Sequence, residues 1–271
     1  MFIGWIRSNS FEADLELFSQ TLTLDKSLIL KTFQENHSLC FGAYDEEKLV
    51  AFISAYEMDE SILINNFYYT DDFDNEGKQR VIRLLLNNIV ESEKSIIYMS
   101  KKEEKDIMLS FGFLEYAKFQ KALYSGGAVA FNFSNATAKS ISNENYLGVL
   151  AYIEKRAYKQ NRVEYIKNAL LKQSSLVLST GFGYQHSYAI SKSLIKISPW
   201  TMEDAAYTDA EKMMRGLIHH RGLKKIIAFV PSDVKEITDL YMSYKFEFVE
   251  EYSLLYLNKK PSIELDMVYA F

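Results

Sequence analysis

The strongest constraint in this sequence is a succession of predicted elements that occurs twice, half a chain apart. In each half a short apolar strand, a polar helix, an aromatic turn and a second strand follow one another. These segments are residues 95–99, 103–110, 111–113 and 116–124 in the first half, and 225–230, 234–243, 244–246 and 252–257 in the second. The offset is 130 residues at the strand (226 minus 96) and 133 at the aromatic turn (246 minus 113). Such self-similarity predicts two structurally equivalent units.

The segments that precede this succession also correspond. Each half contains two strands joined by a turn, a third strand and a helix with an apolar stripe. The strands are expected at residues 38–44, 48–56 and 62–69, and again at 175–179, 184–191 and 194–198. Two helical regions open each half, with Asp25 as one expected N-cap, and a last strand closes each half, at 128–133 and 263–271. The order β-α-α-β-β-β-α-β-α-β-β is therefore predicted twice.

The two halves meet in a polar stretch, residues 134–145, which contains no proline. We therefore expect an N-terminal domain over residues 1–137 and a C-terminal domain over residues 138–271. The predicted class is α/β (α+β), with a mixed, mostly antiparallel twisted sheet flanked by helices in each domain. The chain has only 11 glycines and 3 prolines, where average usage would give roughly 32 of the two together. Glycine-rich phosphate loops are therefore scarce.

Charge and apolar pattern exclude several kinds of partner. The formal net charge of -5 argues against a nucleic-acid partner, which needs a basic face. No apolar run approaches the roughly 18 residues of a membrane helix, and residues 1–7 do not resemble a signal peptide. The single cysteine, Cys40, fits a reducing cytoplasm. We expect a cytoplasmic protein that binds neither nucleic acid nor membranes.

The repeated order resembles the GNAT family of N-acyltransferases, in the tandem form in which two such domains share one chain. Residues 111–113, after a strand and a helix, and residues 240–246 look like the family's LYxxxGF segment, with Lys245 at the usual glycine. Residues 154–162 also resemble a segment seen in the C-terminal halves of tandem GNAT proteins. The resemblance covers nearly the whole chain and implies the same fold in both halves.

The resemblance implies transfer of an acyl group, expected to be acetyl, from acyl-CoA to an amine. In that chemistry a carboxylate, or a water that it orients, takes the proton of the amine. A backbone N–H group of the third strand stabilises the oxyanion. A tyrosine of the LYxxxGF segment often protonates the departing thiolate, and Tyr241 occupies that position, where the first half has Met108. The alternative for Tyr241 is an ordinary half-buried helix residue.

The resemblance also implies that the CoA pyrophosphate binds at the N-terminus of the helix after the third strand. The family loop Q/R-x-x-G-x-G/A has two glycines there, whereas the first half keeps one and residues 201–210 of the second half have none. The candidate cofactor-binding residues are Gly77, Lys78, Gln79 and Arg80. A solvated first helical turn is the alternative. Nearby carboxylates would repel a pyrophosphate; they are Asp71, Asp72, Asp74 and Glu76.

Candidate catalytic and acceptor-binding residues lie on the third strand of each half or beside it. Glu57 and Glu203 are the candidate bases. The candidate substrate-binding residues are Asn66, Tyr68, Tyr69 and His186. For His186 a hydrogen-bonded structural residue is the alternative. No metal site is predicted, because the neighbouring pair His219-His220 has no cysteine or spaced carboxylate cluster beside it.

The favoured hypothesis is an acyl-CoA-dependent N-acyltransferase, with acetyl-CoA as cosubstrate and an amine of a small molecule or peptide as acceptor. One half would be active and the other would support it. The alternative is a catalytically silent tandem GNAT-like protein that acts as a binding or regulatory module, which the degenerate loops favour. A third possibility is a small-molecule sensor with a site in the cleft between the halves, which the excess of aromatic residues favours.

Overall fold

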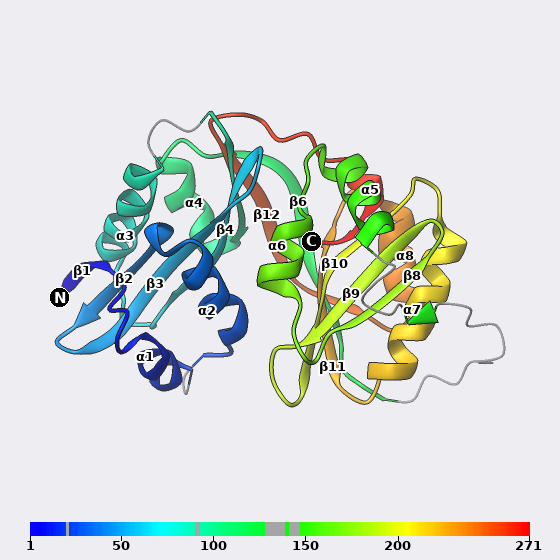
Figure 1. Ribbon diagram of the computed structural model, residues 1–271, viewed down its shortest axis with the longest axis horizontal. Coiled ribbons are helices and arrows are strands. Elements are labelled where there is room, and N and C mark those ends of the chain that lie inside the picture. The colour runs from blue at the N-terminus through cyan, green and yellow to red at the C-terminus, as the bar shows by residue number, and fades with distance from the viewer. Residues whose placement is uncertain (20–21, 90–92, 128–138, 141–146) are drawn as a thin grey trace. The chain divides into compact units, whose positions relative to one another are not determined.

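The computed structural model describes residues 1–19, 22–89, 93–127, 139–140 and 147–271, which form two compact units (Figure 1). Unit 1 comprises Met1–Tyr116 and Leu254–Pro261, and unit 2 comprises Ala117–Ser253 and Ser262–Phe271. Each unit is a mixed α/β structure, as the sequence predicts. The expected boundary between residues 137 and 138, like the strand expected at 128–133, lies outside the described residues.

Unit 1 is built on a twisted sheet in the order β1-β2-β3-β4-β5, followed by the end of β12. Strands β1 to β4 are antiparallel to their neighbours, and β4 and β5 are parallel. The strands are β1 (Phe2–Trp5), β2 (Cys40–Asp45), β3 (Lys48–Glu57), β4 (Ser61–Tyr69), β5 (Ser95–Lys101) and β12 (Glu247–Leu257). The helices are α1 (Phe11–Phe18), α2 (Lys26–Glu35), α3 (Asn75–Asn88) and α4 (Lys102–Ser110), and a 3-10 turn spans His37–Leu39.

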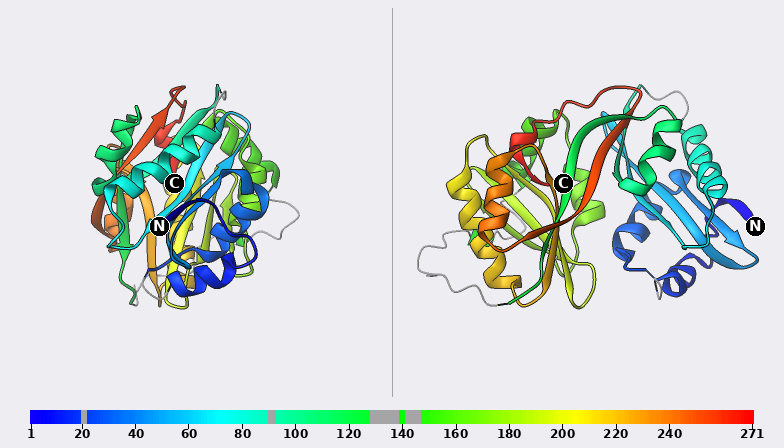
Figure 2. Two further views of the ribbon diagram at one scale, coloured as in Figure 1. Left: turned by 90° about the vertical axis from the view of Figure 1, so that its left-hand side faces the viewer. Right: turned by 180° about the vertical axis from the view of Figure 1, so that it is seen from behind.

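Two hydrophobic clusters cover the two faces of this sheet, because neighbouring residues of a strand point to opposite sides. Phe52 of β3 packs with α1 and α2, whereas Ala51 and Ile53 pack with α3 and α4. Figures 1 and 2 show the two helix pairs on opposite faces of the unit 1 sheet. Asp25 caps α2 as expected, since its Oδ1 accepts a hydrogen bond from the Leu28 N–H at 3.1 Å.

Unit 2 has a sheet in the order β12-β6-β11-β10-β9-β8-β7, and a short strand, β13, that pairs with β10. The strands are β6 (Leu114–Tyr124), β7 (Lys139–Ser140), β8 (Leu176–Thr180), β9 (Gly183–Ala189), β10 (Leu194–Met202), β11 (Lys225–Pro231) and β13 (Val268–Ala270). The helices are α5 (Leu147–Tyr158), α6 (Val163–Tyr165), α7 (Tyr207–Arg221) and α8 (Lys235–Ser243); a π-helical turn, Ile166–Leu170, extends α6. The strand expected over residues 263–271 is shorter than predicted, because Leu265–Met267 forms a 3-10 turn before β13.

Two long strands each belong to both units. The first three residues of β6 lie in unit 1, and the rest lie in unit 2, where β6 pairs with β11 from Ile226↔Tyr124 to Pro231↔Phe119. Conversely, β12 begins in unit 2 and ends in unit 1, where Leu255 is fully buried in the cluster under α3 and α4. The repeat in the sequence predicts these strands but not this exchange of their ends.

The turn that ends α4 in unit 1 and the turn that ends α8 in unit 2 have the same backbone conformation, although their sequences differ. Gly112 has a φ of 88° and Lys245 a φ of 65°, so both residues adopt the left-handed conformation that ends many helices. The following amide then donates back into the helix, from Phe113 to the Met108 carbonyl at 3.3 Å and from Phe246 to the Tyr241 carbonyl at 3.1 Å. Lysine therefore keeps the geometry that glycine provides in the first half.

The close approach of β9 to β10 depends on Gly183. A Cβ at this position would lie 2.5 Å from the Thr201 carbonyl oxygen and 2.7 Å from the Met202 Cα, whereas a Cβ at Gly181 would meet nothing within 4 Å. We expect Gly183→Ala to lower the free energy of unfolding by about 1–3 kcal/mol through overpacking. Gly181→Ala is the matched control and should leave it unchanged. Urea unfolding of both variants measures the difference, and equal midpoints would contradict the prediction.

Candidate functional site

The central parallel strands of unit 1 separate partway along their length. Strands β4 and β5 pair only from Ser61↔Ser95 to Ile64↔Tyr98, although β4 continues to Tyr69. The register between β3 and β4 shifts so that Ser54 lies opposite Asn66 and Ala55 opposite Ile64, which leaves Asn65 as a β-bulge. We call the region beyond the last pair the divergence of unit 1. No described strand pairs with β4 on that edge after Ile64.

The central parallel strands of unit 2 separate in the same way, but there another strand of the chain lies between them. Strands β10 and β11 pair only from Leu194↔Lys225 to Lys196↔Ile227, and the register with β9 shifts between Ile197 and Trp200. We call the region beyond the pair Lys196↔Ile227 the divergence of unit 2; here β13 pairs with the separated part of β10. The two units therefore share one backbone design, and differ in what lies in the divergence.

A buried carboxylate that the sequence did not single out lies at the divergence of unit 1. Glu104 of α4 is 1% exposed and accepts hydrogen bonds from the hydroxyls of Tyr98, the last paired residue of β5, and Tyr69, the last residue of β4. Burial raises the pKa of Glu104; the Tyr98 hydroxyl, the charge and backbone N–H of Lys101, and the Tyr69 hydroxyl oppose that rise only in part. Glu104 thereby joins the two strands after they separate. Its place three residues after a strand end is a helix-capping signal, but nothing local marks it as buried.

Two of the four predicted cofactor-binding residues, Gly77 and Lys78 at the start of α3, contact other side chains of unit 1. The Asp74 carboxylate caps α3 by accepting a hydrogen bond from the Gly77 N–H at 2.6 Å. The ring of Phe73 occupies the space beside Gly77, where a Cβ would lie 2.7 Å from it. Lys78 Nζ lies 3.9 Å from the centre of the Tyr69 ring. Gln79 is half-buried and Arg80 is exposed on the same turn.

The predicted substrate-binding residues of unit 1 lie on two faces of the sheet. Asn66 donates from Nδ2 to Ser54 Oγ at 2.8 Å, and Asn65 donates to Thr32 Oγ1 of α2 at 2.7 Å. Tyr68 packs against Phe52 on this same face, with ring centres 5.4 Å apart. Tyr69, by contrast, points to the opposite face, toward Glu104. The structure thus brings Asn66 and Tyr68 together and separates Tyr69 from them.

One buried polar atom on the α2 face lacks a partner. Asn66 is 2% exposed, and its Oδ1 accepts no hydrogen bond from any described residue. A buried acceptor of this kind is costly unless a ligand or a water donates to it. It therefore marks the β-bulge of β4 as a place where an N–H donor would be stabilised.

The candidate bases are both engaged in ion pairs. Glu57 lies opposite Ile62, before the strands separate, and its carboxylate is 2.7 Å from Lys94 Nζ. Glu203 follows β10 and pairs with Arg156 of α5. Neither carboxylate is joined to the Glu104 network by a hydrogen bond among the described residues. Their catalytic roles remain predictions.

Tyr241 and His186 are fully buried in unit 2. The Tyr241 hydroxyl donates to the carbonyl oxygen of Tyr269 in β13 at 3.0 Å, and burial raises the pKa of Tyr241. His186 Nδ1 donates to the Ser198 carbonyl at 2.6 Å, and its Nε2 shares a hydrogen bond of 2.7 Å with the Ser175 hydroxyl. The proton on Nδ1 follows from this partner, since a carbonyl can only accept. His186 thereby holds the irregular part of β10 in place.

The segment 154–162 builds a buried ion pair that supports β10. Glu154 is fully buried and accepts hydrogen bonds from Arg162 Nε at 2.6 Å, from Thr201 Oγ1 at 2.8 Å and from the Tyr184 hydroxyl. The Arg162 guanidinium also stacks on the Tyr158 ring at 3.4 Å. Three donors satisfy the buried carboxylate, which such a group requires.

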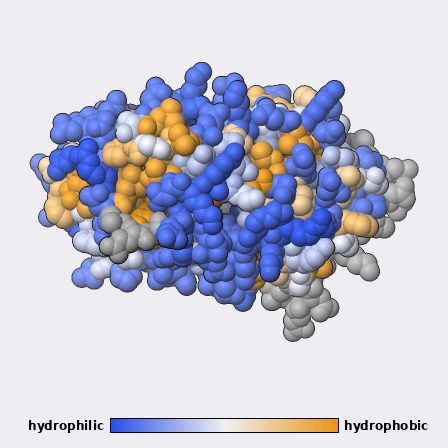
Figure 3. All heavy atoms as spheres, turned by 90° about the horizontal axis from the view of Figure 1, so that it is seen from above, coloured by the Kyte–Doolittle hydropathy of each residue, from blue (hydrophilic) through white to orange (hydrophobic). Residues whose placement is uncertain are grey.

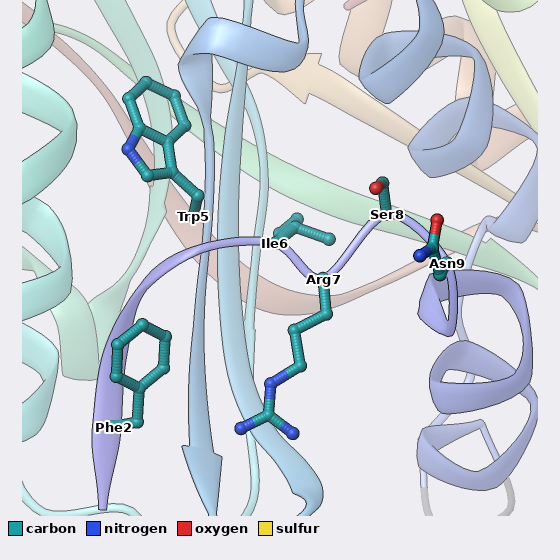
Figure 4. Close-up of a pocket in the computed structure, with 6 residues that line it drawn as sticks. All are labelled: Phe2, Trp5, Ile6, Arg7, Ser8 and Asn9. Carbon is teal, nitrogen blue, oxygen red and sulfur yellow. The ribbon is translucent and has the colours of Figure 1, made fainter.

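A separate surface pocket of about 430 Å³ lies at the N-terminal segment of unit 1, and Figure 4 shows Trp5 and Arg7, which both line it, on opposite sides of this segment. Strands β2 and β3 separate β1 from β4, so this pocket is distant from the divergence.

In the view of Figure 3, hydrophobic residues form separate patches among hydrophilic ones. Within the described part of the chain, no three His, Cys, Asp or Glu side chains are grouped to hold a metal ion. None of the described helices is long and apolar enough to cross a membrane.

The raised pKa of Glu104 predicts a pH-dependent stability. A carboxyl whose pKa in the folded chain lies above its ordinary value of 4.5 binds its proton more tightly in the folded chain. The free energy of unfolding therefore falls as the pH rises from 4.5 through the folded-state pKa. We expect the unfolding free energy of the wild type, relative to Glu104→Gln, to fall as the pH rises above 4.5. Glu103→Gln, at the exposed neighbouring residue, should run parallel to the wild type. Urea midpoints across pH 4.5–8 test this, and parallel curves for Glu104→Gln would refute it.

Several solved structures resemble this chain, whereas no protein-family model and no curated protein matches its sequence. A candidate acetyltransferase from Pyrococcus horikoshii superposes with a TM-score of 0.78 at 15% identity, over 100% of this chain and 93% of the other. A GCN5-related N-acetyltransferase from Sphaerobacter thermophilus gives a TM-score of 0.53 at 10% identity, over 84% and 83%. A tandem GNAT protein from the clavulanic acid biosynthesis pathway gives 0.55 at 8% identity, over 80% and 82%.

At these identities the likeness establishes the fold, and it confirms the resemblance that the repeat indicates. One of these three structures is itself a tandem GNAT protein, which agrees with the two units of this chain. The chain therefore has the fold of the GCN5-related N-acetyltransferases, in two tandem units.

Proposed function

We propose that this chain is an acyl-CoA-dependent N-acyltransferase that moves an acetyl group from acetyl-CoA to an amine of a small molecule or peptide, and that unit 1 carries the activity. The observation that supports this most directly is the separated edge of β4 after Ile64. An unpaired strand edge offers N–H and C=O groups to an extended ligand with amide groups. The pantetheine arm of acyl-CoA is such a ligand.

Unit 2 supplies an internal example of this kind of pairing. The equivalent edge of β10 is paired with an extended segment, β13. Because the two units share the bulge and the separation of the strands, the edge of β4 is suited to a similar extended group. The Glu104 network supports this site, since it holds Tyr69 and Tyr98 of the separated strands together.

The acceptor amine is proposed to lie on the α2 face, beside the bulge. The unpartnered Asn66 Oδ1 suits an N–H donor, and Tyr68 offers an aromatic wall beside it. Transfer forms an amide bond, breaks the thioester and releases the CoA thiol. A backbone N–H left unpaired where β4 separates from β5 is the proposed donor to the developing oxyanion.

A catalytically silent binding module is the second candidate function, and one observation favours it. The N-terminus of α3, where a pyrophosphate would be expected, is closed by the Asp74 carboxylate and the Phe73 ring. Both groups oppose an anion there, one by charge and one by volume. The first of the two following experiments separates the candidates.

We expect the protein to release CoA thiol from acetyl-CoA in the presence of a panel of primary amines. Acetyl-CoA should slow amide hydrogen exchange in the peptide that contains residues 65–69, because the ligand pairs with that edge. Thiol detection and exchange mass spectrometry measure the two effects. Absence of thiol release, together with no binding heat at millimolar acetyl-CoA, would refute the enzyme and favour the silent module.

We also expect the nucleotide part of CoA to contribute little to binding, because α3 has no free anion site. The KM for S-acetyl-pantetheine should lie within about tenfold of that for acetyl-CoA, a difference below about 1.4 kcal/mol. Steady-state kinetics with both donors and one amine measure this. A KM for the shorter donor that is higher by several orders of magnitude would show that the diphosphate is held after all.

A further inference from the structure

Strand β13 occupies the divergence of unit 2 with backbone contacts on both sides. It pairs antiparallel with β10 at Trp200↔Ala270 and Thr201↔Val268. On the other side, the Phe271 N–H donates to the Phe229 carbonyl of β11 at 2.9 Å. A strand-like ligand of unit 2 would need the same edge of β10. The backbone groups of that edge of β10 are already paired with β13.

The side chains of β13 belong to the core of unit 2. Tyr269 is fully buried, with its ring centre 5.1 Å from that of Trp200 and 6.5 Å from that of Tyr207. Tyr269 and Ala270 are members of the main hydrophobic cluster of the unit. The Tyr241 hydroxyl donates to the Tyr269 carbonyl at 3.0 Å, so this tyrosine is directed at β13. Burial of an aromatic side chain to this extent stabilises β13 in its place beside β10.

The segment that leads into β13, and the strand that receives it, are also fixed. The Glu264 N–H donates to the Ala157 carbonyl of α5 at 2.8 Å. Thr201, which pairs with Val268, is held by the buried Glu154 carboxylate. The first residue of α7, Tyr207, packs on Tyr269, so the start of this helix also faces β13. Three elements of unit 2 are thus arranged around this strand.

We infer that β13 is a built-in occupant that closes unit 2 to acyl-CoA, so that the chain has one acyl-CoA site rather than two. The single site in unit 1 rests on the proposed function, whereas the closure of unit 2 does not. In this arrangement Tyr241 stabilises β13 and does not protonate a leaving thiolate. The edge of β10 is paired with a segment of the same chain and not with a bound ligand.

The chain offers a direct reporter for this inference. It has two tryptophans, of which Trp5 is 52% exposed and Trp200 is buried against Tyr269. In a Trp5→Phe background, fluorescence therefore reports on Trp200 alone. Exchange mass spectrometry of the peptide covering residues 263–271 gives a second, independent readout of whether β13 is seated.

We expect the full-length Trp5→Phe protein to show blue-shifted emission and slow exchange over residues 263–271, both unchanged by saturating acetyl-CoA. Tyr269→Ala should shift the emission to the red and speed exchange over this peptide at least tenfold. Ser262→Ala, at an exposed residue just before the segment, is the matched control and should change neither. If Tyr269→Ala does not fold, Tyr241→Phe removes only the hydroxyl that bonds to Tyr269 and should speed the same exchange by a smaller factor.

The outcomes distinguish the closure of unit 2 from the activity of unit 1. Exchange over residues 263–271 at the rate of a free peptide, or an emission shift and faster exchange when acetyl-CoA is added, would overturn the closure. A calorimetric stoichiometry of two acetyl-CoA molecules per chain would overturn it as well. Slow exchange of β13 without any acetyl-CoA binding would uphold the closure and refute the proposed function instead.

Discussion

The backbone hydrogen bonds of a strand that separates from its parallel neighbour must find other partners, and both units are organised around this requirement. The bulge at Asn65 in β4 and the irregularity at Ser198 and Pro199 in β10 mark where each central strand departs from regular pairing. His186 holds the second irregularity through the Ser198 carbonyl. The surrounding helices and capping residues are arranged around these two separated strands.

Among the described residues, only unit 2 meets this requirement with a paired segment of the chain. In unit 2 a peptide segment completes the edge, and Trp200 and Tyr241 pack around it. In unit 1 a side-chain network through Glu104 joins the separated strands, while the edge of β4 has no described strand beside it. Duplication has thus preserved the backbone of the site while its contents have diverged. Conserving a fold in this way does not conserve a function.

Much of the fold could be predicted from the sequence because its signals are local. Alternating apolar residues predict β2, β3 and β4 to within a few residues, and Asp25 is the N-cap that the pattern indicates. The exchange of β6 and β12 could not be predicted, because strand periodicity does not specify the partner strand. Glu104 looks like one charge of a polar helix, and only the tertiary packing of Tyr69 and Tyr98 makes it a buried acceptor. Likewise Gly77 is the one glycine near the predicted phosphate loop, one place out of register, and in space it accommodates Phe73.

The two strands that change units also determine when each unit can be completed during synthesis. Unit 1 needs residues 254–261, so its sheet stays one strand short until the ribosome has translated that distant segment. Unit 2 takes most of β6 from a segment made more than fifty residues before β8. Contacts this distant in sequence slow folding, since the intervening chain must first be brought together. The nascent first half therefore carries an open sheet edge until residues 254–261 emerge, and an open edge of this kind is prone to pair with other chains.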